Sequence, residues 1–73
     1  MVGNFSGKFV SGKKITPKDK NPFYVNYFVD VKGDVISFIS SAQMPFVFGD
    51  ECEFALDVSM YNGKVSYRFA EDF

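Results

Sequence analysis

The sequence predicts an all-β fold, a small five-stranded antiparallel barrel, on three observations. Apolar and polar residues alternate at a period of two, and no segment has the period of about 3.6 residues that marks an amphipathic helix. Short segments rich in Gly, Pro, Asn and Asp separate the alternating stretches. With 73 residues, the chain has room for a single domain, 1–73. A closed barrel fits because it removes the strand edges that so small a sheet leaves open. An SH3-like barrel has similar strand content and is the alternative.

The first half of the chain predicts three strands, over residues 4–12, 23–31 and 35–40. A polar loop or hairpin tip over 13–22 joins the first two, and a tight turn over 32–34 joins the next two. The second strand is rich in β-forming residues. We expect one of its faces to carry only large apolar side chains and the other, outward face to be half polar. The first face comprises Val25, Tyr27, Val29 and Val31; the second comprises Tyr24, Asn26, Phe28 and Asp30.

The second half predicts a connector and a hairpin. The connector, residues 41–50, holds Phe46 and Phe48, which we expect to cover a barrel end or a partner. The strands 51–60 and 64–71 alternate on both sides of Asn62-Gly63, the pair that best tolerates the positive φ angles of a type I′ turn. The expected inward residues are Phe54, Leu56, Val58, Met60, Val65, Tyr67 and Phe69, with Lys64, Ser66 and Arg68 outside.

The residues that most enzymes use are missing or poorly placed. The chain has no His, so it has no Ser-His or Cys-His nucleophile. Cys52 stands among Asp50, Glu51 and Glu53, whose charges disfavour a reactive thiolate. These acids do not have the spacing of a calcium loop, and no phosphate-binding or dinucleotide-binding glycine pattern occurs. We therefore expect no catalysis, no metal site, no cofactor and no small-molecule substrate.

Cellular setting and assembly follow from composition. A single Cys excludes an intrachain disulfide and fits a reducing, cytoplasmic location. No apolar run approaches the roughly 18 residues of a membrane span, and no signal-peptide layout precedes the first strand. A core this small is marginal alone, so we expect a homodimer.

Charge is unevenly distributed along the chain. Residues 1–32 hold six Lys and two Asp, a balance of +4, whereas residues 33–73 have a balance of −5. The loop lysines are followed at once by aromatic residues, and Arg68 lies outward on a later strand. Binders of single-stranded nucleic acid need cations for phosphates and rings for bases on one surface. The candidate site residues on this reasoning are Lys13, Lys14, Lys18, Lys20, Phe23, Tyr24, Phe28 and Arg68.

The order of these features resembles the filamentous-phage single-stranded-DNA-binding proteins. The resemblance rests on Ser11-Gly12-Lys13-Lys14, Pro22-Phe23, Phe28-Val29-Asp30, Gln43 and Pro45, Gly49, Tyr61 with Gly63, and Arg68. It covers residues 8–69 in pattern; Phe stands at two positions where the family has Tyr, and Lys where it has Arg.

The resemblance implies a dimeric OB-fold barrel with a basic β-hairpin wing. Phe23, Phe28 and Tyr61 would stack on bases, and Lys13, Lys14 and Arg68 would contact phosphates. The predicted function is sequence-nonspecific binding of single-stranded DNA, or RNA, in replication or transfer of a phage, plasmid or mobile element. The alternative is a protein-interaction module or inhibitor that uses the exposed aromatics and the acidic half. A purely structural subunit is a third possibility. The terminal Glu71-Asp72-Phe73 is similar to the partner-docking tip of bacterial single-strand-binding proteins, although a strand end is the simpler interpretation.

Overall fold

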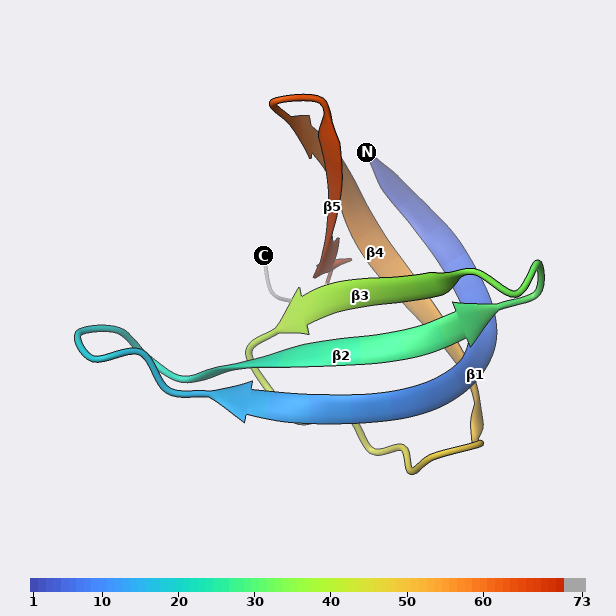
Figure 1. Ribbon diagram of the computed structural model, residues 1–73, viewed down its shortest axis with the longest axis horizontal. Coiled ribbons are helices and arrows are strands. Elements are labelled where there is room, and N and C mark those ends of the chain that lie inside the picture. The colour runs from blue at the N-terminus through green and yellow to red at the C-terminus, as the bar shows by residue number, and fades with distance from the viewer. Residues whose placement is uncertain (71–73) are drawn as a thin grey trace.

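The computed structural model describes residues 1–70, which form a closed barrel of five strands (Figure 1). These are β1 (Val2–Ile15), β2 (Phe23–Asp30), β3 (Val35–Ser40), β4 (Glu51–Tyr61) and β5 (Lys64–Phe69). The order around the barrel is β1-β2-β3-β5-β4, and β4 pairs back to β1. The predicted five-stranded all-β barrel is confirmed. One neighbour pair, β3 with β5, is parallel; alternation could not indicate this, because a period of two is independent of strand direction.

Within residues 1–70, no helix is long and apolar enough to cross a membrane. The C-terminal residues considered as a docking tip, 71–73, lie outside the described residues.

The long first strand holds the barrel together by pairing with two neighbours. Its first part, Val2 to Lys8, pairs with β4, and its second part, Gly7 to Ile15, pairs with β2. At the overlap, a Cβ atom on Gly7 would collide with the backbone carbonyl of Val29. Glycine therefore lets β1 bend closely across β2. A register shift between Phe9 and Ser11 follows, as expected for a β-bulge at a bend.

The core is built mainly from aromatic rings. The Phe38 and Phe54 centroids lie 4.6 Å apart, and those of Phe28 and Phe54 lie 5.3 Å apart. Phe46, from the connector, is partly buried and packs against Phe54 of the core, with ring centroids 5.4 Å apart. Its neighbour Phe48 is 81% exposed. The buried apolar residues are Phe9, Phe28, Ile36, Phe38, Met44, Cys52, Phe54 and Leu56.

The predicted orientation of β2 is wrong. Asn26 and Phe28, expected on the outward face, are both 0% exposed, whereas Tyr27 is 37% exposed and Val31 is 83% exposed. Phe28 fits inside because it packs against core rings from β3 and β4. Asn26 is accommodated because its Nδ2 donates a hydrogen bond to Ser40 Oγ at 2.8 Å. The half-polar face of this strand is therefore its core face.

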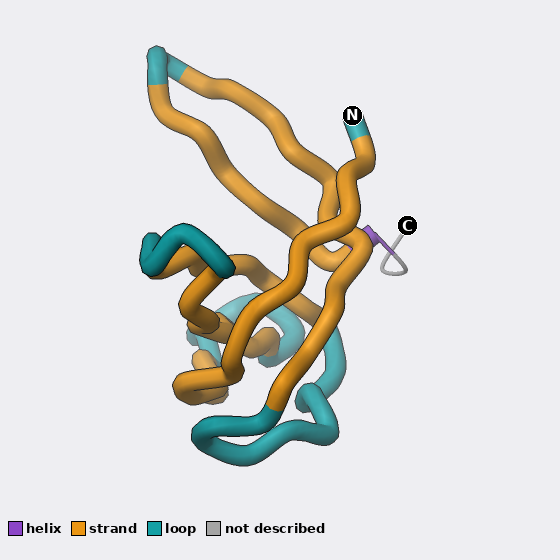
Figure 2. Tube along the Cα trace, turned by 90° about the vertical axis from the view of Figure 1, so that its right-hand side faces the viewer, coloured by secondary structure: helices purple, strands orange, loops and turns teal. Residues whose placement is uncertain are grey.

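Two hairpins extend beyond the barrel. The β1–β2 hairpin, here called the wing (residues 13–25), projects to one side, and the β4–β5 hairpin projects away from it (Figures 1 and 2). The Asn62-Gly63 turn has φ angles of 52° and 77°, which confirms the predicted positive-φ turn. Met60 and Val65, expected to face inward, are instead exposed, because they pair with each other past the end of the core.

Candidate functional site

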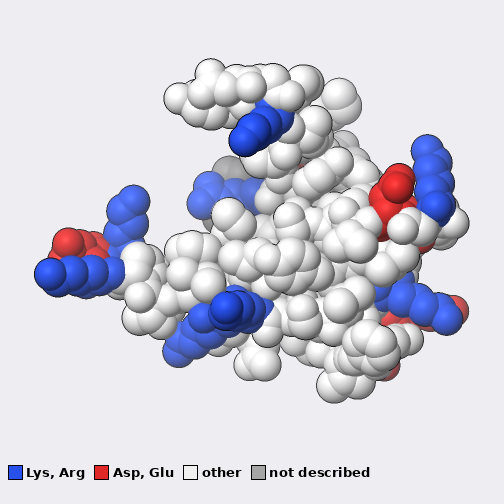
Figure 3. All heavy atoms as spheres, viewed as in Figure 1, with Lys and Arg blue, Asp and Glu red and all other residues white. Residues whose placement is uncertain are grey.

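A cleft separates β3 from β5 on the side where the barrel is least tightly closed. The two strands share a single residue pair, Ile39 with Arg68. Away from this pair, β3 and β5 enclose a cleft of about 210 Å³, which is also bordered by β2. Figure 3 shows the molecule hollowed between the β4–β5 hairpin at the top and the wing at the left. The lining residues are Val25, Ser37, Phe38, Ile39, Val65, Ser66 and Tyr67.

One face of the wing continues into this cleft. Lys13 lies opposite Val25, which in turn lies opposite Ile39. Residues directly opposite in an antiparallel pair project from the same face, and so do residues two apart on one strand. Tyr27, two residues after Val25, therefore shares the face of Lys13 and Ile39. We call this the outer face: Lys13, Phe23, Val25, Tyr27, Ser37 and Ile39.

The structure divides the predicted wing residues between two faces. Phe23 pairs with Ile15 and lies half-buried on the outer face. Lys14 and Tyr24 pair with each other and project from the opposite face of the wing. The sequence predicts Lys13 and Lys14 in a loop and Phe23 and Tyr24 at the start of the next strand, but β1 continues to Ile15, so successive side chains of the wing alternate between faces.

The tip of the wing (residues 16–22) carries the two remaining predicted lysines. Lys18 and Lys20 are exposed and flank Asp19. Figure 3 shows these charges clustered at the far left, with further basic side chains along the hairpin. The tip therefore lies at one end of the molecule's longest dimension, which measures 37 Å.

The other predicted residues are on the second hairpin. Tyr61 is 76% exposed and pairs with Lys64 beside the Asn62-Gly63 turn. Arg68 projects outward from β5, opposite Asp57 and next to Ile39 at the edge of the cleft. Of these residues, Arg68 is the one that neighbours the cleft lining, whereas Tyr61 and Lys64 lie at the end of the second hairpin.

Phe28 must be removed from the candidate site. Its ring is fully buried among Phe38 and Phe54, so it has no face free for a nucleic-acid base. Sequence reasoning missed Tyr27, the exposed ring of the outer face. One signal could have found it: of two adjacent rings, the one with a hydroxyl is the better placed in contact with water.

Cys52 is a buried, free thiol at the start of β4. Burial, together with the negative charge of Asp50, raises the pKa of the Cys52 thiol. Its Sγ lies 3.5 Å from the carbonyl oxygen of Gly7, to which the thiol can donate a hydrogen bond. Among residues 1–70, no group of three or more His, Cys, Asp and Glu side chains is placed to hold a metal ion.

Comparison of the chain with protein-family models, with curated proteins and with solved structures finds no match in any of the three.

Proposed function

We propose that the protein binds single-stranded DNA without sequence specificity along the outer face and across the cleft between β3 and β5. The observation that carries the proposal is the placement of an exposed ring, Tyr27, diagonally beside a cation, Lys13, on a face that opens into the cleft. A single strand needs this combination, because phosphates require cations and bases require flat surfaces.

Each group has a role in this arrangement. Tyr27 and Phe23 stack on bases along the outer face, and Tyr61 receives a base at the second hairpin. Lys13, the tip lysines and Arg68 contact phosphates and release counterions. Lys14 and Tyr24 face away from this path. The apolar floor, formed by Val25 and Ile39, supports ring packing, and its side chains offer no hydrogen bond that could distinguish one base from another, so we expect binding without sequence specificity.

The barrel topology supports the same location. In OB folds, also five-stranded barrels, the face of the second and third strands and the loops after the first and fourth strands bind oligonucleotides. Here the corresponding loops are the tip and the Asn62-Gly63 turn. The resemblance to filamentous-phage single-stranded-DNA-binding proteins, and with it a cytoplasmic role in replication or transfer of a mobile replicon, belongs to this proposal.

The test is a tyrosine-fluorescence titration with oligo-dT at low and high salt, with duplex DNA of equal length as the control. The chain has no Trp and four Tyr, so tyrosine emission reports on the site. Quenching by single strands alone, weakened by salt, is the expected result. A Tyr27→Phe variant keeps the ring and should retain affinity while the quenching amplitude falls. If no oligonucleotide, DNA or RNA, changes the emission at low salt, the proposal is wrong and a protein partner becomes the better hypothesis.

A further inference from the structure

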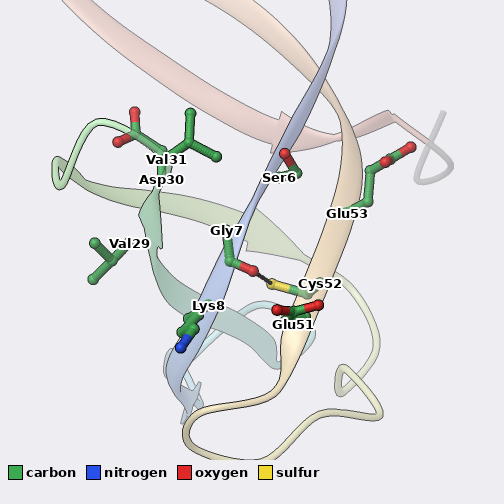
Figure 4. A pocket seen from close by; sticks show the side chains of 9 residues that line it. All are labelled: Ser6, Gly7, Lys8, Val29, Asp30, Val31, Glu51, Cys52 and Glu53. Carbon is green, nitrogen blue, oxygen red and sulfur yellow. Dashed lines mark hydrogen bonds between the residues drawn. The ribbon is translucent and has the colours of Figure 1, made fainter.

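A second hollow lies at the opposite end of the molecule from the tip. It is a groove of about 630 Å³ where β1 bends between its two neighbours. Figure 4 shows its lining, contributed by the middle of β1, the end of β2 and the start of β4. We call it the acidic groove: Ser6, Gly7, Lys8, Val29, Asp30, Val31, Glu51, Cys52 and Glu53.

The acidic groove has a distinctive charge arrangement. Three carboxylates, those of Asp30, Glu51 and Glu53, line it with one cation, Lys8, a net charge of −2. Lys8 lies directly opposite Glu51 in the β1–β4 pairing, whereas Glu53 lies opposite Ser6. Val29 and Val31 supply an apolar wall against which the methylene stem of a long side chain can pack.

The tip carries the complementary arrangement. Lys18, Asp19 and Lys20 form an exposed turn with a net charge of +1, opposite in sign to the acidic groove, and the single cation of the groove, Lys8, is matched by the single acid of the tip, Asp19. The tip and the acidic groove lie at opposite ends of the longest axis (Figures 1 and 3). One chain therefore cannot join them within itself, but two chains can.

We propose that the tip of one copy docks in the acidic groove of a second copy. The contact is heterologous, so repetition produces an open head-to-tail chain instead of a closed dimer. Opposite charges steer the two ends together, and the attraction weakens as salt screens it. The lysine stems lie on Val29 and Val31, and Asp19 meets Lys8.

This contact has a consequence for nucleic-acid binding, which rests on the function proposed above. The carboxylates of the acidic groove and the phosphates of DNA would bind the same lysines of the tip. The groove and DNA therefore compete for the tip. Single-stranded DNA then takes the head-to-tail chain apart as it binds, and the acidic groove limits binding at high protein concentration.

The first test follows the weight-average mass by sedimentation equilibrium at low salt as protein concentration rises. The parent mass should grow continuously with concentration and fall back at high salt. Neither Lys18→Gln/Lys20→Gln nor Glu51→Gln/Glu53→Gln should show this growth, and each should hold a constant mass. All four positions are exposed, so both variants should fold. Lys64→Gln, which removes an exposed cation elsewhere, should behave as the parent. Equal growth in the parent and the tip variant would overturn the proposal.

The second test mixes the two defective variants. The groove variant keeps its tip and the tip variant keeps its groove, so together they should form a one-to-one complex and nothing longer. With the groove variant ¹⁵N-labelled, added tip variant should shift amide signals of residues 16–22. With the labels reversed, the shifts should fall on residues 6–8, 29–31 and 51–53. A quadruple variant lacking both ends should cause no shift. Absent shifts, or shifts elsewhere, would refute the contact.

These experiments contain no DNA, so their result does not depend on the proposed function. Competition is tested afterwards by adding oligo-dT to the parent at high protein concentration. The mass should fall to that of the DNA-bound unit, and Glu51→Gln/Glu53→Gln should bind more tightly than the parent at high concentration but equally at low concentration. An oligonucleotide that binds without reducing head-to-tail growth would refute the competition.

Discussion

Inside the barrel, the side-chain amide of Asn26 donates a hydrogen bond of 2.8 Å to Oγ of Ser40. Both residues are fully buried. The Ser40 hydroxyl in turn donates to the carbonyl oxygen of Ala42 at 2.8 Å. A short polar chain therefore runs from the middle of β2 to the first residues after β3 and fixes the start of the connector. Within the described residues, Asn26 Oδ1 has no hydrogen-bond partner.

This polar chain predicts a measurable coupling between the two residues. Ser40→Ala removes the close acceptor of the Asn26 amide and should lower the free energy of unfolding by about 1–3 kcal/mol. The Asn26→Ala/Ser40→Ala double variant should lose less than the sum of the single variants, because residues that share a hydrogen bond are not additive. Urea denaturation of the four proteins measures the cycle. Additive losses would show that the two side chains do not support each other.

The same pair explains where sequence reasoning about the fold failed. Strand number, the Asn62-Gly63 turn and the inward face of β4 around Phe54 and Leu56 were predictable, because local turn chemistry and clean alternation encode them. In β2, large side chains occupy both faces, so the alternation of apolar and polar residues does not distinguish the core face from the outward face. The polar side chain of Asn26 then led to the wrong prediction that its face points outward. A buried Asn is recognisable only once its partner, Ser40, is known, and that pairing depends on register between strands.

Adjacent rings in β2 should respond in opposite ways to truncation. Phe28→Ala empties space between core rings and should cost about 3–5 kcal/mol of stability. Tyr27→Ala should change stability far less but weaken binding of oligo-dT by about 1–3 kcal/mol. Thermal unfolding and fluorescence-anisotropy titration of a labelled oligonucleotide separate the effects. Unchanged affinity in a folded Tyr27→Ala protein would remove Tyr27 from the site.

The two neighbouring wing lysines should differ in their contribution to salt dependence. Lys13 lies on the outer face with Val25, whereas Lys14 projects from the opposite face. Lys13→Gln should reduce the slope of log affinity against log salt by about 0.7, the value for one phosphate contact with a single strand. Lys14→Gln is the matched control and should leave the slope unchanged. Equal slopes for both variants would mean that the strand does not follow the outer face.

For the candidate site, the sequence indicated the chemistry but could not indicate the geometry. The lysines and rings around residues 13–24 were evident from their clustering. Which of them share a face depends on the extension of β1 to Ile15 and on the register shift after Phe9, and neither has a local signature. Likewise, the acidic groove exists only because β1 bends at Gly7 and brings β2 and β4 together.

Stability should fall in alkaline solution because of Cys52. Burial and the charge of Asp50 raise the pKa of its thiol in the folded chain above the value of about 8.5 in an unfolded one. The stabilisation is complete below the unfolded pKa and is lost as pH rises through the folded pKa, since the unfolded chain loses its proton first. Urea denaturation of the parent and of Cys52→Ala between neutral and alkaline pH measures this: the parent should lose more stability than the variant as pH rises. Parallel curves for the two proteins would contradict the assignment.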